Sequence, residues 1–175
     1  MTKKISTFLL LSILLFTFIS CGEGKAENVV KEYIHLIQNQ DYTTAYSLIS
    51  SKDKENTSLD DFISYYNNKN KISPSFIIHL LNLRNSTFTD LQAVKLDKTN
   101  YEVSVLAYSP IYTESFELQL KKDIEALQYS CNTIEGILEL LEIEYKDTSF
   151  DTEEILYSYN VIKEDGKYKI FIDIM

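Results

Sequence analysis

The chain has 175 residues, and its 26 acidic and 17 basic side chains give a formal net charge of −9 at pH 7. Such a surface disfavours nucleic acid and anionic lipid headgroups as partners, because both are bound mainly through Lys and Arg. Hydrophobic residues make up 45% of the chain, which has only four Gly and two Pro. This composition predicts one domain with a packed core and argues against long disordered segments.

The first 20 residues have the pattern of an export signal. Lys3 and Lys4 precede an apolar run from Ile5 to Ile19, and the small residue Ser20 follows. A basic head, an apolar core and a small residue at the end are typical of a signal peptide. Ser and Thr interrupt the run, which falls short of the roughly 20 apolar residues that a transmembrane helix needs.

The end of this segment, Phe18-Ile19-Ser20-Cys21, resembles the lipobox of bacterial lipoproteins, with Phe18 where Leu is usual. The resemblance implies that residues 1–20 are removed and that Cys21 is lipidated, which anchors the chain on the extracytoplasmic side of a bacterial membrane. More than one acyl chain is needed for stable anchoring. An uncleaved signal anchor and an exported protein with a free cysteine are the alternatives.

The lipobox resemblance sets the domain organisation. Residues 21–26 would be a lipidated cysteine and short tether, followed by a single domain over 27–175. Without residues 1–20 the net charge would be about −11 on the reference pKa values. Cys131 would be the only thiol left, so no internal disulfide is expected.

The first part of the domain is predicted to be helical. Apolar residues fall on one broad helical face between Glu27 and Gln40. Asp41 is a good N-cap for a second, short helix that ends near Ile49. The charged, serine-bearing stretch from Ser50 to Thr57 is predicted to be a loop.

Two further helix starts follow. Ser58-Leu59-Asp60-Asp61 is similar to a capping box and predicts a third helix through Tyr66. Ser73-Pro74 predicts a fourth, with Ser73 as N-cap and Pro74 in the first turn. The apolar run Phe76-Ile77-Ile78 leaves a buried strand as the alternative, and we favour the helix.

Two hairpins are predicted. Residues 88–96 and 101–107 have strand character, with a turn at 97–100 between them. Residues 155–163 and 167–174 form the second pair, and Asp165-Gly166 marks a tight turn between them.

A helical segment from Phe116 to Tyr145 lies between the two hairpins. It is either a seam for a partner chain, which leaves a homodimer open, or one amphipathic helix, or two joined near Asn132 and Gly136, on the protein's own sheet. We favour the second interpretation, because the repeat spans only about four heptads and Gly136 weakens a continuous helix. The apolar positions have a 4-3-4-3 spacing: Leu120, Ile124, Leu127, Cys131, Ile134, Leu138, Leu141 and Tyr145.

These elements predict an α+β fold, and two motifs make a resemblance specific. The stretch 39–46, at the turn between the first two helices, and the stretch 163–170, in the last hairpin, look like those of the nuclear transport factor 2-like domains of small bacterial lipoproteins. Tyr168 stands where that family usually has Trp. The resemblance covers most of 26–173 and implies a cone-like fold in which N-terminal helices pack on a curved antiparallel sheet. The helical insert at about 116–145 departs from the simplest members.

No motif for a cofactor, a nucleophile or a metal is found. His35 lies at the polar edge of the first helix and is predicted to be at the surface or half-buried. His79 lies in an apolar run and is predicted to be a satisfied core histidine. Glu139, Glu142 and Glu144 could attract a cation weakly, although a solvated helix face explains them better.

Two functional hypotheses remain. The preferred one is a non-catalytic lipoprotein of the bacterial envelope, anchored at Cys21, that holds a small or apolar ligand or docks an envelope protein. The alternative is a cone-pocket enzyme of the ketosteroid isomerase or dehydratase kind, which would need a buried Asp or Glu beside a Tyr. The 13 tyrosines do not single out a candidate, and most are expected to be core or rim aromatics.

Overall fold

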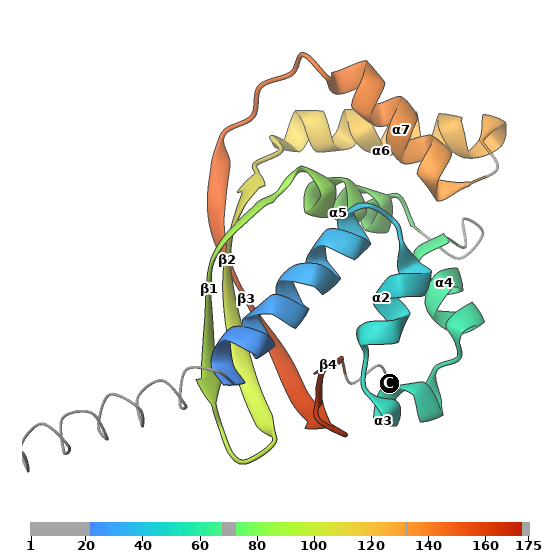
Figure 1. Cartoon of the computed structure of the whole chain (residues 1–175). Coiled ribbons are helices and arrows are strands. Elements are labelled where there is room, and N and C mark those ends of the chain that lie inside the picture. Colours follow the sequence, from blue (N-terminus) through green and yellow to red (C-terminus); the bar gives the residue numbers. More distant parts are fainter. Residues whose placement is uncertain (1–21, 68–72, 132, 173–175) are drawn as a thin grey trace, which may run out of the picture.

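The computed structural model describes residues 22–67, 73–131 and 133–172, and it has the α+β architecture predicted from the sequence (Figure 1). Helices precede the sheet, and a pair of helices lies between its second and third strands. The N-terminal helix, over residues 22–38, has no label in Figure 1. Four labelled helices come next: α2 (Tyr42–Leu48), α3 (Ser51–Asn56), α4 (Leu59–Asn67) and α5 (Pro74–Asn85).

The sheet is antiparallel and curves around the N-terminal helix (Figure 1). Its strands follow chain order: β1 (Thr87–Lys95), β2 (Asn100–Pro110), β3 (Thr152–Glu164) and β4 (Lys167–Phe171). Asp165 and Gly166 have φ values of 48° and 79°. A two-residue turn of type I′ needs positive φ at both positions, so the predicted turn is confirmed.

The predicted caps start the helices as expected. The side chain of Asp41 accepts a hydrogen bond from Thr44 N, and the Ser58 hydroxyl accepts one from Asp61 N. Ser73 caps α5 and Pro74 lies in its first turn, so the run after it is a helix and not a strand. These side chains satisfy backbone N–H groups that have no partner within the helix.

The stretch from Ser50 to Thr57 is not only a loop, because it contains α3. Ser50 caps this helix by accepting a hydrogen bond from Asp53 N. The Asp53 carboxylate accepts hydrogen bonds from the Ser50 hydroxyl and from Ile172 N, at 2.7 and 3.1 Å. The short helix is therefore held by a contact more than 100 residues away in sequence, which a local pattern does not reveal.

The helical insert forms two helices, α6 (Glu114–Ser130) and α7 (Ile134–Tyr145). Two helices were among the predicted arrangements, but the expectation that they lie on the sheet is wrong. Their apolar positions pack against α5 and form a second hydrophobic core, apart from the one under the sheet. The fully or nearly buried members of this second core are Ile77, Ile78, Leu80, Leu81, Leu120, Ile124, Ile134, Ile137, Leu138 and Leu141.

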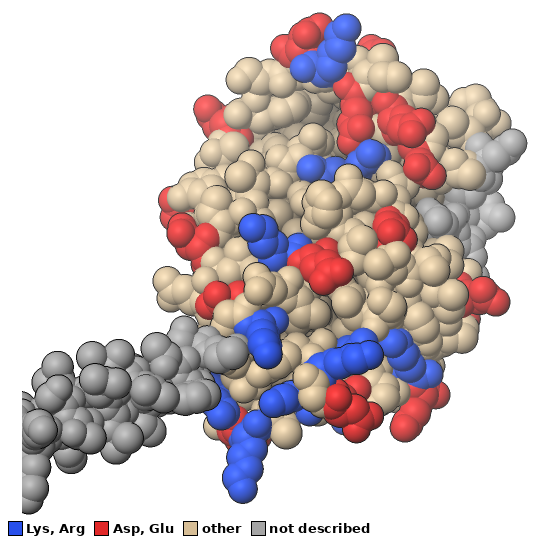
Figure 2. All heavy atoms as spheres, in the orientation of Figure 1, with Lys and Arg blue, Asp and Glu red and all other residues tan. Residues whose placement is uncertain are grey.

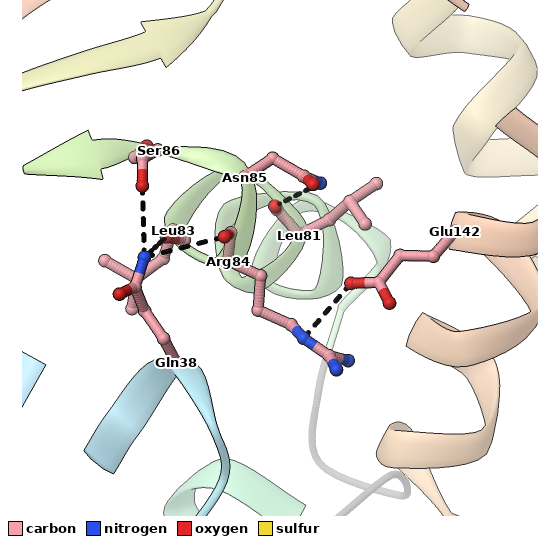
Figure 3. Close-up of polar contacts among 7 residues, drawn as sticks. All are labelled: Gln38, Leu81, Leu83, Arg84, Asn85, Ser86 and Glu142. Carbon is pink, nitrogen blue, oxygen red and sulfur yellow. Dashed lines mark hydrogen bonds and ion pairs between the residues drawn. The ribbon is translucent and has the colours of Figure 1, made fainter. Parts of the chain in front are cut away.

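The C-terminal end of α5 joins the two cores (Figure 3). The Gln38 side-chain amide, from the N-terminal helix, donates to the carbonyl oxygens of Leu83 and Ser86 at 3.0 and 3.1 Å. Arg84 Nε forms an ion pair with Glu142 of α7 at 3.1 Å. One helix end is thereby tied to both halves of the molecule.

We expect Gln38→Glu to lower the free energy of unfolding by about 1–3 kcal/mol, because a carboxylate cannot donate to these carbonyl groups. Urea unfolding measures the change. Gln92→Glu is the matched control, since Gln92 is exposed on β1, and it should change the free energy by less than about 0.5 kcal/mol. Equal effects of the two substitutions would contradict the role given to Gln38.

Candidate functional site

A cavity of about 200 Å³ lies between the N-terminal helix, α4, α5 and β3. Five tyrosines line it together with His79 and several Ile and Leu side chains, and we call it the tyrosine cavity. The tyrosines are Tyr33, Tyr65, Tyr66, Tyr157 and Tyr159.

Local structure explains why the tyrosines converge. Tyr157 and Tyr159 are two residues apart on β3, and alternate residues of a strand point to the same face. Tyr33 is only 5% exposed, and its ring meets that of Tyr159 edge-on at 6.4 Å. Tyr66, from α4, shares a side-chain hydrogen bond with Tyr33. The hydroxyl groups come from three separate elements.

The mouth of the cavity is aromatic. The Tyr65 ring is 60% exposed and packs edge-on against Tyr66 and Phe76, with centroids 5.1 and 5.3 Å apart. Phe76 also lies beside His79, at 6.3 Å between ring centroids. These contacts place one exposed phenol and one exposed imidazole at the entrance.

Burial favours the neutral form of three of the phenol groups even above their ordinary range. It raises the pKa of Tyr33 and of Tyr66 above the ordinary value of 10. It also raises the pKa of Tyr159 to about 12, with a smaller contribution from Tyr157 and Tyr66. At neutral pH the cavity therefore offers hydroxyl groups that donate or accept hydrogen bonds, and these groups are not anions or proton-abstracting bases.

The cavity lacks the constellation that the enzyme hypothesis needs. Of the described residues that line it, none is Asp or Glu. A ketosteroid isomerase-like site would pair such a carboxylate with a tyrosine, because the carboxylate transfers the proton and the phenol stabilises the oxyanion. This lining suits the binding of an apolar molecule with one or two polar atoms.

The prediction made for one histidine is confirmed and that made for the other is wrong. His35 is exposed as predicted, and its imidazole contacts the side-chain amide of Asn39 at 3.1 Å. The prediction that His79 is a core histidine is wrong, because it is exposed at the cavity mouth. Its neighbours Ile78 and Leu80 are buried, so α5 turns only this position of the apolar run outward.

The acidic stretch on α7 is partly structural. Glu139 and Glu144 are exposed, as expected of a solvated face, whereas Glu142 is half-buried and paired with Arg84. Over the part of the chain that the structure describes, no group of three or more His, Cys, Asp or Glu side chains could hold a metal ion. Cys21, the predicted lipidation site, lies outside the described residues.

No helix within the described ranges is long and apolar enough to span a bilayer. No model of a known protein family matches the chain, and a comparison with curated proteins gives no match. The site is therefore interpreted from its own residues. The spacing Tyr157-x-Tyr159 on a predicted strand was the sequence signal that could have located it.

Stability should fall at alkaline pH, because Tyr159 has a pKa of about 12 in the folded chain and about 10 when unfolded. The unfolded state then loses its proton first, so stability that is present below pH 10 is lost as the pH rises toward 12. Between these values wild type should lose up to about 1.4 kcal/mol per pH unit more than Tyr159→Phe. Urea unfolding from pH 9 to 12 measures this. Parallel curves for the two proteins would contradict the shift.

Proposed function

We propose that this protein is an exported, lipid-anchored and non-catalytic binding protein of the bacterial envelope, whose cone-like domain holds a small, mostly apolar ligand. The observation that carries the proposal is the tyrosine cavity, which combines apolar walls with neutral hydroxyl groups. Ligand sites are typically concave and apolar, with a few polar groups that orient the ligand. At about 200 Å³ the cavity is smaller than sites for drug-sized molecules, so the ligand is small.

The arrangement of helices and sheet supports a nuclear transport factor 2-like domain. A curved antiparallel sheet wraps the N-terminal helix, and helices α2 and α4 close the same core (Figure 1). Docking of an envelope protein is the other form of this function, and it would use the outer surface in place of the cavity. The tyrosine cavity does not favour the enzyme alternative, since none of the described residues that line this cavity is Asp or Glu.

The distribution of charge supports an anchor next to residue 22. Gly22 lies beside the hydroxyl groups of Tyr101 and Tyr168, which a Cβ at this position would meet, at the end of the sheet where both hairpins turn. Lys95 and Lys163, from these hairpins, act electrostatically on the Tyr101 hydroxyl. On the face in Figure 2, most of the basic side chains lie at this lower end, where the N-terminal helix begins, with a few acidic ones among them.

The negative charge is concentrated elsewhere. Residues 114–154, which include α6 and α7, hold twelve acidic residues and three lysines. The expectation that the whole surface repels anionic headgroups is therefore too general. An anchor at Cys21 would place the lysine-bearing end at the membrane and the acidic helices away from it, which reduces repulsion by anionic lipid.

We expect Cys21→Ser to abolish lipidation and cleavage, because the thiol of Cys21 would carry the diacylglyceryl group. Intact mass of the membrane fraction should then show the uncut precursor, while wild type should show a chain that starts at Cys21 with added lipid. Cys131→Ser is the matched control and should mature normally. Normal maturation of the Cys21 variant would refute the anchor.

The ligand can be tested by native mass spectrometry of the mature chain, purified gently from its own host. We expect a reproducible added mass on wild type and its loss in Leu83→Trp, because Leu83 lines the cavity and indole would fill it. Leu156→Trp is the matched control, since Leu156 is 71% exposed on β3, and it should keep the mass. A bare wild-type chain would contradict a ligand in the cavity, and a mass that both variants keep would place the ligand outside it.

A further inference from the structure

A second cavity, of about 510 Å³, lies between the end of α5, the helices α6 and α7 and the start of β3. It belongs to the helical insert and shares none of its described lining residues with the tyrosine cavity. Its volume falls within the range of about 300–1,000 Å³ that is common for small-molecule sites. We call it the insert pocket.

Four aromatic rings form one wall of the insert pocket. Phe116 is the centre, with ring centroids 5.4 Å from Tyr112, 4.9 Å from Tyr145 and 4.8 Å from Phe150. Tyr112 and Phe150 also meet edge-on, at 5.0 Å. All four side chains are half-buried, so each ring has one part in this cluster and another part open to the pocket or to solvent. Ring faces carry partial negative charge and attract cations.

A carboxylate lines the same pocket. Glu142 lies on α7 opposite the end of α5, and one of its carboxylate oxygens forms an ion pair with Arg84 (Figure 3). Tyr145 donates a hydrogen bond to Asp123, which adds a second carboxylate next to the aromatic wall. The pocket thus combines aromatic rings with one lining carboxylate, and a second carboxylate is bonded to its wall.

The charged residues that line the pocket are Glu142 and Lys146, and the chain segment around them is acidic. The segment 114–154, which supplies most of the lining, has nine more acidic residues than lysines. Two positively charged side chains oppose this negative charge. Arg84 is paired with Glu142, and Lys146 is exposed at the rim. A pocket in so acidic a region concentrates cations from solution.

We propose that the insert pocket binds an organic ammonium ion, of the quaternary or methylated-amine class. Such ions carry their charge in an apolar shell, and aromatic walls bind them by cation–π attraction while a carboxylate supplies charge complementarity. A bare metal ion would lack ligands here, because the described residues include no group of three or more His, Cys, Asp or Glu that could hold one. The inference does not depend on the tyrosine cavity, and only the form in which the protein is tested rests on the proposed lipid anchor.

The test uses choline and its uncharged isostere, 3,3-dimethylbutan-1-ol, with the full mature chain in nanodiscs of phosphatidylglycerol, which lacks choline headgroups. Isothermal titration calorimetry should show choline binding at least about tenfold tighter than the isostere, and weaker binding at higher salt. Equal affinities would mean that the pocket recognises shape without charge, and no binding at millimolar choline would also overturn the proposal.

Variants locate the site. Phe116→Leu keeps an apolar side chain but removes the central ring, and Glu142→Gln removes the carboxylate; each should weaken choline binding about fivefold or more. Lys146→Gln should strengthen it, because a repelling charge at the rim is lost. Lys122→Gln is the matched control, an equal change of charge on α6 at a residue that does not line the pocket, and it should change affinity less than twofold.

Thermal stability and the direction of the Lys146→Gln effect make the binding result interpretable. Thermal unfolding of every variant separates loss of the site from loss of the fold. If Lys146→Gln weakens choline binding while Lys122→Gln does not, the charge of Lys146 does not oppose the bound cation and the proposal fails.

Discussion

The C-terminal end of α5 is the joint on which the rest of the structure depends. The last carbonyl groups of any helix lack partners within the helix, and here they lie between two hydrophobic cores where water cannot easily serve them. Gln38 supplies hydrogen-bond donors from one side. The Ser86 hydroxyl, which follows the helix, donates to the Asn82 carbonyl and is 2.7 Å from the buried Ser109 hydroxyl of β2. These polar groups therefore fix α5 to the N-terminal helix and to β2. The helical insert in turn packs on α5 through apolar contacts and the ion pair of Arg84 with Glu142.

This joint also separates the two cavities. Phe76, His79, Leu80 and Leu83 follow helical spacing and face the tyrosine cavity, whereas Leu81 and Asn85, four residues apart, face the insert pocket. One helix thus forms a wall of both. The two linings differ in chemistry because their other walls differ: strand β3 contributes tyrosines on one side, and α7 contributes Glu142 on the other.

The sequence was informative wherever structure is set locally. Asp41, Ser58 and Ser73 start helices through hydrogen bonds within three residues, and Asp165-Gly166 forms its turn through its own φ angles. The sequence was less informative where a segment's structure depends on contact with a residue distant in the chain. The 4-3-4-3 stripe of α6 and α7 predicts an apolar face but not that α5 covers it, and α3 depends on Ile172. The apolar neighbours of His79 suggested burial, although α5 is covered on two sides and leaves that position open.

The net charge summed over the sequence also does not tell where on the folded surface the charged residues lie. The acidic excess predicted that the whole surface would repel anions. Most of this excess lies in one segment around α6 and α7, away from the lysines of the two hairpins. Electrostatic potential falls within about 10 Å at ordinary ionic strength, so each end acts on its own surroundings. The proposed anchor would bring the lysine-bearing end to an anionic surface, whereas the acidic excess of residues 114–154 lies in the segment that forms most of the insert pocket. Because the charges are separated in this way, the two proposals, a membrane-facing end and a cation-binding pocket, are compatible in one acidic chain.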